Sequence, residues 1–487
     1  MAQILSRRTG RVPRVSARLL AVALMLTLGG CLAVGPDYLK PAAIVPIRYK
    51  EIKGWKAATP RDEAAKGAWW RAFHDSELDR LEATVAVSNQ TLKADEANYR
   101  QALAFIAQAR AGLFPTLNLD PTLTRSGPPG GNLLNSEITG AWTLDVWGRV
   151  RRLIEENGAG AQATAADLAN ATLAEQSTLA LAYMQVRQAD SLRDLFSDTV
   201  KQYQRALEIT QNQYNAGTAA KSDVITAQAL LLSAQAQEIN VEVARKQAEH
   251  AVAVLMGKPP AEVSISHRDL AETAPHPPVR LPSTLLERRP DIAAAERTMK
   301  QQNAAIGVAV AGYYPDITLS GAFGYAGDPF IKQIAGANPV WSYGVSLAQP
   351  LFDAGLTAAQ VEAAKAAYEA SVATYRQTVL TAFQQVEDNL AAISTYDREL
   401  KVQKEAVRIA RQAVQIALNE YRAGTQNFTT VVTAEATALQ DEELLVATKA
   451  SRLAAAVSLI VALGGGWDVE DLPRLASDAP PDAQPTP

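Results

Sequence analysis

The chain carries the same short motifs twice, about two hundred residues apart. The segment 214–218 (YNAGT) recurs as 421–425 (YRAGT), 207 residues later, and the segment 111–115 (AGLFP) recurs as 311–315 (AGYYP), 200 residues later. This period is much longer than the roughly 20–50 residues of a solenoid repeat. The chain is therefore expected to consist of two structurally similar halves.

The first 30 residues have the features of a lipoprotein signal peptide. Five arginines precede an apolar stretch, Leu19–Leu28. This stretch is shorter than the about 20 residues that are needed to span a bilayer. The segment 28–31 (LGGC) matches a lipoprotein signal-peptidase site, so Cys31 is the expected lipidation residue. The alternative is a buried structural cysteine. Cys31 is the only cysteine in the sequence, which leaves no second cysteine for a disulfide and no metal-ligand spacing.

The mature N-terminus and the charge indicate where the protein acts. Residue 32 is Leu, whereas Asp at this position typically retains a Gram-negative lipoprotein at the inner membrane, so sorting to the outer membrane is expected. Removal of the signal peptide takes away five arginines and no acidic residue, which leaves 42 basic and 51 acidic residues. This balance is opposite to that of polyanion-binding proteins, and we predict no nucleic-acid partner.

Four segments alternate apolar and polar residues with a period of two, as strands between two environments do. We predict strands at 115–124, 137–147, 315–325 and 341–351, joined in pairs by Gly- and Pro-rich loops at 125–136 and 326–339. Each segment has about the length of a tilted membrane-spanning strand. The alternative is a half-buried soluble sheet. Four strands cannot close a membrane barrel alone, because the smallest barrels have about eight, so several copies of the chain would have to share one.

Long helices are predicted for most of the remaining chain. Gly148–Asn215 contains no proline, Leu356–Arg422 is the matching segment, and each would extend roughly 100 Å if continuous. A coiled-coil-like seam is formed by Leu400, Val407, Val414 and Tyr421, with Ala410 and Ala417 between them. An elongated coiled coil without a pore is the alternative interpretation of these helices.

Two further expectations concern the helices. The repeat offset changes from 200 near Tyr183 and Phe383 to 207 at Tyr214 and Tyr421, which we interpret as an insertion of one heptad within the helix. No stretch after Cys31 is expected to be long and apolar enough for a transmembrane helix.

Each long helix ends at an Ala-Gly-Thr motif. Gly217 and Gly424 suit the left-handed conformation that closes a helix, and the predicted hairpin tips are 214–223 and 421–430. Caps for the next helices are expected from Ser222 or Asp223 in the first half, and from Thr425 or Asn427 in the second. Turn chemistry alone explains these residues, and docking of a partner there is an added hypothesis.

These elements predict an order of segments along the chain. They are a signal peptide (1–30), a lipid-anchored extended segment (31–68), a first repeat (69–257), an equatorial crossover (258–290), a second repeat (291–467) and a C-terminal tail (468–487) whose end is disordered. The expected fold class is mainly α with a membrane β-barrel.

The sequence offers no catalytic site. His74, His250, His267 and His276 lack metalloprotease or zinc spacing, and neither a Gly-rich phosphate loop nor a nucleophile-elbow serine is present. We therefore predict that the protein is not an enzyme and binds no metal or cofactor apart from the covalent lipid on Cys31.

Four motifs together resemble one known family. They are CLAVGPDY at 31–38, WWRAF at 69–73, LPSTLLERRPDI at 281–292 and LGGGW at 463–467. Their order resembles that of the TolC-like outer-membrane efflux proteins, in particular the NodT-type lipoproteins. The resemblance implies a homotrimer in which three protomers build a 12-stranded barrel on a long periplasmic α-helical barrel, with a mixed equatorial belt. It also implies a periplasmic membrane-fusion adaptor and an inner-membrane resistance-nodulation-division pump as partners.

On this resemblance, the protein would be the passive exit duct of a tripartite efflux pump in the Gram-negative outer membrane. Adaptor docking is expected at the tips, at Tyr214, Gly217, Thr218, Tyr421, Gly424 and Thr425. Acidic residues often ring the closed aperture in this family; Asp223 matches, but Thr430 and Thr433 stand in the second half, which puts a second acidic ring in doubt. Asp223 as a helix cap is the equal alternative. A duct for type I protein secretion and a lipid-anchored periplasmic coiled-coil scaffold are the alternative functions.

Overall fold

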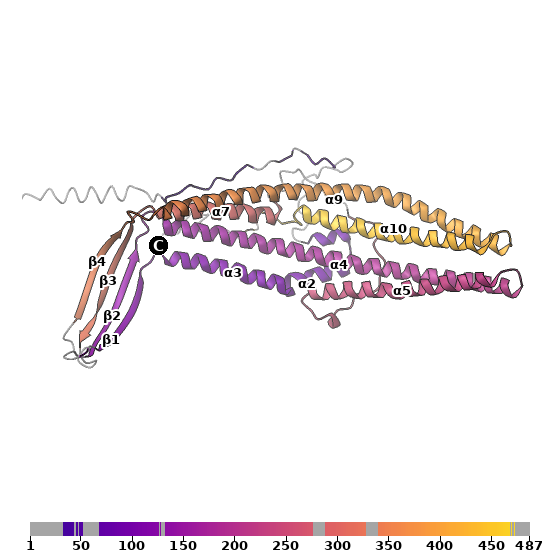
Figure 1. The fold of residues 1–487 in the computed structure, drawn as a ribbon, viewed down its shortest axis with the longest axis horizontal. Helices are drawn as coiled ribbons and strands as arrows, with labels where there is room; N and C mark the ends of the chain where they lie inside the picture. Colours follow the sequence, from indigo (N-terminus) through magenta and orange to yellow (C-terminus); the bar gives the residue numbers. More distant parts are fainter. Residues whose placement is uncertain are drawn as a thin grey trace, which may run out of the picture. The chain divides into compact units, whose positions relative to one another are not determined.

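The computed structural model describes residues 33–42, 45–46, 48–51, 68–125, 127, 132–275, 288–327, 339–467, 469 and 472. The elements, in chain order, are η1 (Trp69–Phe73), α2 (Ser76–Ser88), α3 (Gln90–Ala111), β1 (Thr116–Arg125), β2 (Asn132–Thr143), α4 (Arg149–Asn215), α5 (Lys221–Leu255), η2 (Pro260–Glu262), α7 (Pro290–Ala311), β3 (Asp316–Gly327), β4 (Pro339–Ala348), α9 (Leu356–Arg422) and α10 (Phe428–Ala462) (Figure 1). Cys31 and His276 lie outside the described residues, as do most of 281–292 and most of the C-terminal tail.

The chain divides into two compact units, and each unit takes segments from both sequence halves. The strand unit comprises 1–39, 103–159 and 299–370, and the hairpin unit comprises 40–102, 160–298 and 371–487. The units therefore do not coincide with the two repeats. All four strands belong to the strand unit, and the ends of the long helices belong to the hairpin unit.

The two repeats are equal in length over their helices. α4 and α9 have 67 residues each, and α5 and α10 have 35 each. The offset is thus 207 from the first residue of α4 onwards, and Tyr183 matches Leu390 rather than Phe383. The interpretation of a heptad insertion within the helix is wrong. The start of β3 follows that of β1 by 200 residues, whereas the start of β4 follows that of β2 by 207. The extra residues of the second half therefore lie between the start of β3 and the start of β4.

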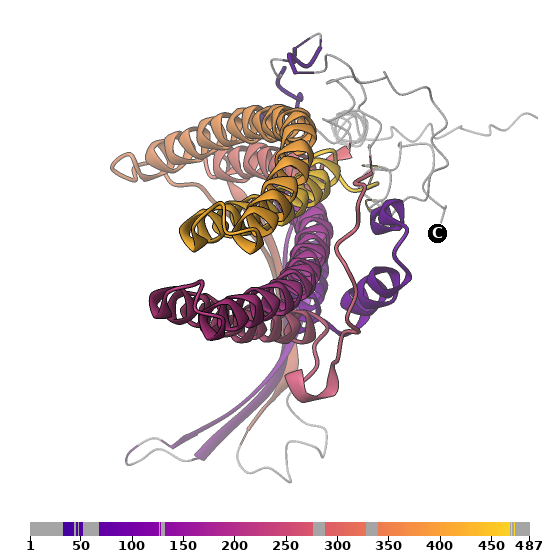
Figure 2. The same ribbon diagram turned by 90° about the vertical axis from the view of Figure 1, so that its right-hand side faces the viewer.

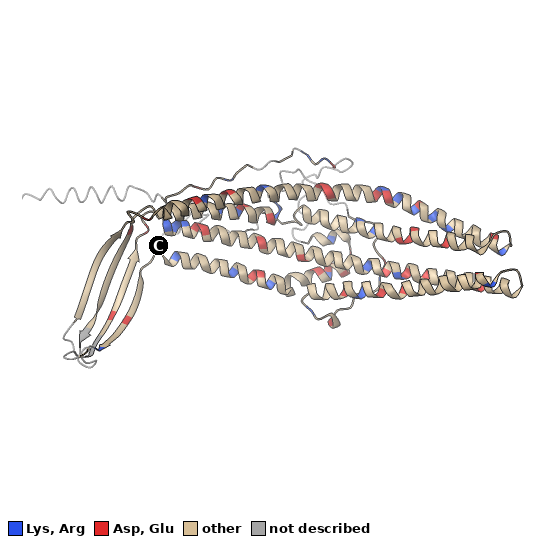
Figure 3. Ribbon diagram, in the orientation of Figure 1, with Lys and Arg blue, Asp and Glu red and all other residues tan. Residues whose placement is uncertain are grey.

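The four strands form one antiparallel sheet in the order β1-β2-β3-β4, with β1 and β4 at its edges. Its register places apolar residues in rows on one face, such as Leu119, Ile138, Phe323 and Trp341. The next row, on the other face, contains Asn118, Thr139, Ala322 and Ser342. Figure 3 shows few charged residues on the strands. The predicted alternation is confirmed, and the sheet has one apolar face and one face of small, mostly polar residues.

The strand bounds differ from the predicted ones. β1 is 116–125 rather than 115–124, β2 is 132–143 rather than 137–147, β3 is 316–327 rather than 315–325, and β4 is 339–348 rather than 341–351. β2 begins early because Asn132 and Leu133 still pair with the end of β1, so the loop at 125–136 is shorter than expected. β2 ends early because the Asp145 carboxylate accepts hydrogen bonds from Val150 N (2.8 Å) and Arg151 N (3.0 Å) and so caps α4.

Within the strand unit, the segment after Cys31 is fastened to two helices. Val34 N donates to Trp147 O (3.0 Å), and the Arg152 guanidinium donates to Val34 O (3.1 Å) and to Asp37 Oδ1 (2.9 Å). Gly35, with φ 94°, lies so close to α7 that a Cβ there would stand 2.4 Å from Gly307 Cα. Only glycine fits at this crossing.

Among the described helices, α10 is the one that is long and apolar enough to cross a membrane. An 18-residue window in Phe428–Ala462 has a mean hydropathy of 1.7, so the expectation that no helix after Cys31 is apolar enough is wrong by length and composition. The cause is its content of Ala, Val and Leu, which serves packing: 44% of that window is buried within the chain. Core helices of soluble proteins can have the same length and composition.

The hairpin unit contains two helical hairpins, α4–α5 (hairpin 1) and α9–α10 (hairpin 2), which Figure 2 shows side by side. The predicted seam on α9 is buried at Val407, Ala410, Val414, Ala417 and Tyr421. Ala410 and Val414 pack against Ala438 of α10, which confirms a coiled-coil-like contact within hairpin 2.

A buried ion network joins α2, α4, α5 and the segment after η2. Arg187 is 2% exposed; its guanidinium donates to Asp190 Oδ2 (2.9 Å), Glu77 Oε2 (2.6 Å) and Ser266 O (2.5 Å). Asp190, fully buried, also accepts from Arg245 Nε at 2.6 Å. These bonds hold the segment near Ser266 against the helices.

Candidate functional site

The two hairpins close with the same turn. Gly217 (φ 79°) and Gly424 (φ 74°) both adopt the left-handed conformation. Thr218 N donates to Gln213 O (2.9 Å) and Thr425 N donates to Glu420 O (3.0 Å), the six-residue hydrogen bond of a Schellman motif. The predicted role of both glycines in ending the helices is confirmed.

The helix caps at the tips differ between the halves. α5 begins at Lys221, its cap residue is Ala220 without a side-chain bond, and Ser222 and Asp223 lie inside the first turn. The predicted capping by Ser222 or Asp223 is therefore wrong, because the helix begins before either side chain. In the second half Asn427 caps α10 by accepting from Thr430 N at 3.2 Å, as predicted.

The tips contact each other through Tyr421. The ring centroids of Tyr421 and Phe428 lie 5.2 Å apart. Gln213 Nε2 of hairpin 1 donates a hydrogen bond to the Tyr421 carbonyl oxygen at 3.1 Å. Ala227 of α5 and Val431 of α10 complete the buried cluster. Tyr214, the repeat partner of Tyr421, is 40% exposed, whereas Tyr421 is 5% exposed. The two copies of the motif thus differ in the burial of their tyrosine.

The charge of Asp223 acts on the Tyr421 hydroxyl of this cluster. Burial raises the pKa of the Tyr421 hydroxyl, Thr210 lowers it, and the Asp223 carboxylate raises it further. Asp223 and Tyr421, one from each predicted tip, thus interact electrostatically. Thr430 and Thr433 are exposed, and the Thr433 hydroxyl donates to Thr429 O at 2.9 Å.

A buried acid above the tips was not predicted. Glu435 of α10 is 4% exposed, and burial raises its pKa to about 7. The pKa of Tyr203 of α4 is raised to about 12, first by burial of its ring and next by the charge of Glu435. The signal was present in the sequence, because Glu435 follows Phe428 by one heptad and so falls on the buried side of α10.

The left-handed turn at Gly424 is sensitive to substitution. Gly424→Ala is expected to destabilise the tip by about 1–2 kcal/mol, because an L-residue is strained at this φ although a Cβ would meet no atom within 4 Å. Hydrogen exchange of amides 418–430 would measure this as faster local opening. Ala423→Ser, one residue earlier, is the matched control, and equal exchange in both variants would contradict the prediction.

The fold is that of outer-membrane channels. The structure of the outer-membrane channel OprN superposes with a TM-score of 0.82 at 28% identity over 89% of this chain and 99% of that chain. The Campylobacter jejuni CmeC outer membrane channel superposes with a TM-score of 0.84 at 20% identity, over 90% of this chain and 96% of that chain, which supports the fold alone.

The chain belongs to the outer membrane efflux protein family, whose model matches residues 83–258 and 281–465. It is 30% identical to the toluene efflux pump outer membrane protein TtgC of Pseudomonas putida, over 90% of this chain and 93% of that protein. It is 27% identical to nodulation protein T of Rhizobium leguminosarum bv. trifolii, over 84% and 89%. The resemblance found in the sequence motifs is confirmed, and the protein is an outer-membrane efflux protein.

Proposed function

We propose that three copies of this chain form the exit duct of a tripartite efflux pump, which conducts small toxic compounds passively from the periplasm to the exterior. The observation that carries this proposal is the sheet, which has an apolar face, a face of small polar residues and two edge strands. Three such sheets provide twelve strands, within the range of closed membrane barrels, and closure removes the free edges. The apolar face would meet lipid and the other face would line water.

The tips would be where a periplasmic adaptor docks. Tyr214, Gly217 and Thr218 of hairpin 1 and Gly424 and Thr425 of hairpin 2 are all exposed. Tyr421 is buried among them and would respond to docking by a change in packing. An inner-membrane resistance-nodulation-division pump would supply the energy, in keeping with a protein that is itself not an enzyme. A lipid on Cys31 would add a second attachment to the outer membrane.

Single-channel recording in planar bilayers tests the duct. We expect the purified trimer to give discrete conductance steps. Asp223→Ala is expected to raise the open probability severalfold and to weaken the response to cations, because it removes the tip carboxylate whose charge acts on Tyr421. Glu208→Ala, at an exposed position of α4, is the control.

The negative outcomes are distinct. Unchanged conductance and cation response in Asp223→Ala would remove Asp223 from the gate and leave the duct in place. If neither the native trimer nor variants with loosened tips ever conduct, the duct itself is wrong and the coiled-coil scaffold replaces it.

A further inference from the structure

One carboxyl group lies in the apolar core that joins the two hairpins above their tips. Phe428, Val431 and Ala438 of α10 are buried at heptad spacing, and Glu435 occupies the position of the same series between Val431 and Ala438. Glu435 is 4% exposed, and its Oε2 has no hydrogen-bond partner among the described residues. An ionisable residue thus stands at a position that helix packing favours for an apolar one.

Helices of both hairpins supply the core around this carboxyl. The buried cluster that contains Val431 of α10 also contains Tyr421 of α9 and Ala227 of α5, and Leu207 of α4 packs against it. Val431 precedes Glu435 by about one helical turn. The Glu435 side chain therefore belongs to the core that holds hairpin 1 against hairpin 2.

A cleft between the hairpins begins at the residue after Glu435. Ala436 lines this cleft together with Tyr203 of α4 and Gln237 of α5, and its volume is about 210 Å³. The cleft has room for several water molecules, since each takes about 30 Å³ in the liquid. Room for water thus exists next to a carboxyl that is itself buried.

The ionisable groups of the neighbouring helices give Glu435 no compensating charge. On α4, the hydroxyl of Tyr203 faces it, and the charges of Glu435, Glu443 and Glu442 all raise the pKa of Tyr203. On α9, the Arg411 guanidinium is paired with Glu442. Burial raises the pKa of Glu435 to about 7 and is the only cause of that rise.

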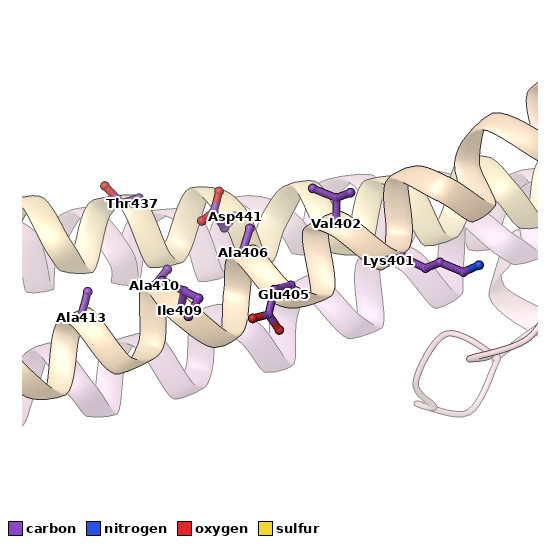
Figure 4. A pocket seen from close by; sticks show the side chains of 9 residues that line it. All are labelled: Lys401, Val402, Glu405, Ala406, Ile409, Ala410, Ala413, Thr437 and Asp441. Carbon is purple, nitrogen blue, oxygen red and sulfur yellow. The ribbon is translucent and has the colours of Figure 1, made fainter.

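The charges on the other sides of the core do not reach this carboxyl either. α5 has no ionisable residue between Asp223 and Glu238. Figure 4 shows a groove between α9 and α10 that is lined by three charged side chains, Lys401, Glu405 and Asp441. None of them contributes to the raised pKa of Glu435. Ionisation of Glu435 therefore leaves an unpaired negative charge in the core.

The first half of the chain lacks this group. The repeat partner of Glu435, 207 residues earlier, is Gln228, which is exposed and has no titratable proton. The buried carboxyl is thus a property of hairpin 2 alone. Glutamine, which has nearly the same shape, is the substitution that removes the charge and keeps the volume.

We propose that Glu435 is a proton-operated clasp between the two hairpins: its neutral carboxyl keeps them packed, and its carboxylate loosens them because the charge draws water from the cleft into the core. This inference rests on the proposed duct, to which it adds regulation by the pH of the periplasm.

The direction of the effect follows from the two environments of the carboxyl. In water its pKa is 4.5, whereas between the packed hairpins the pKa is about 7. The packed arrangement is therefore most favoured below pH 4.5 and loses stability as the pH rises towards 7. Above about pH 7 both arrangements carry the charge, and the loss is complete.

Hydrogen exchange of the full-length trimer in detergent tests the clasp. Exchange of amides 428–440 is measured from pH 5 to pH 7 and divided by the intrinsic rate at each pH, which gives the opening equilibrium. We expect this opening to increase on the order of tenfold in the native protein. Glu435→Gln should keep the native pH 5 value throughout, whereas Glu208→Gln, at an exposed position of α4, should show the native increase.

Glu443→Gln separates Glu435 from the other carboxyl that lines the cleft. We expect the native increase in this variant. An increase that persists in Glu435→Gln, or that disappears in Glu443→Gln, overturns the clasp, and so does a native opening that does not change with pH.

Single-channel recording at the same pH values keeps the clasp and the duct distinguishable. Open probability that rises with pH in the native trimer and stays low in Glu435→Gln supports the regulation. Open probability that is equal at every pH overturns the regulation and leaves the duct in place. Trimers that never conduct, but whose amides 428–440 still open with rising pH, overturn the duct and leave the clasp.

Discussion

Replacing Arg187 with alanine will lower the free energy of unfolding of the detergent-solubilised protein by about 3–5 kcal/mol, because the buried carboxylates around it lose their partner. Asp190 is fully buried, and Glu77 accepts from the same guanidinium at 2.6 Å. Ser266 O, at 2.5 Å, also loses its donor. Urea unfolding followed by tryptophan fluorescence measures the change.

Lys201→Ala on the same helix is the matched control. Lys201 pairs with Asp198 at 2.8 Å, but both side chains are about two-thirds exposed. Ion pairs this exposed contribute little to stability, so the midpoint should hardly move. Equal losses for the two variants would show that burial does not set the strength of the Arg187 network.

Replacing Glu82 with glutamine will stabilise the protein, and more so as the pH rises. Glu82 of α2 is fully buried, neither of its carboxyl oxygens has a hydrogen-bond partner, and burial raises its pKa to about 9. The unfolded chain loses this proton near pH 4.5, whereas the folded protein keeps it up to about pH 9. Stability therefore falls with rising pH between these values, by about 3 kcal/mol at pH 7.

The slope against pH separates this effect from simple repacking. The gain of Glu82→Gln over the native chain should be small at pH 5 and grow until about pH 9. Glu208→Gln, at an exposed position, should show no such growth. A gain in Glu82→Gln that is constant from pH 5 to pH 8 would mean that the buried carboxyl is not the titrating group.

Local patterns allowed much of the fold to be predicted. Alternation located all four strands within a few residues, and the two glycines located both hairpin tips. The bounds of β2 could not be predicted, because they depend on its pairing with Arg125 and on the capping carboxylate of Asp145. The motif repeats fixed the offset at the tips but not the place where it changes, which lies between the strands of the second half.

The sequence predicted those parts of the candidate site in which a single residue type is enough to form the local structure. A left-handed turn demands glycine, so Gly217 and Gly424 were found, and the capping amide of Asn427 follows from its place before a helix. The cap residue of α5 was not found, because Ala220 has no capping side chain and the polar residues that suit the role follow it. Contacts such as that of Gln213 with Tyr421 depend on how two hairpins pack, and the sequence order of either hairpin does not contain that information.

The fastening of the N-terminal segment sets the reach of the proposed lipid. Val34 and Gly35 are held by Trp147, Arg152 and the close crossing at Gly307. Cys31 precedes Val34 by only three residues, which span at most about 11 Å of extended chain. The proposed lipid on Cys31 would therefore enter the bilayer beside the start of α4, and it would fix the level at which the membrane surface meets the protein.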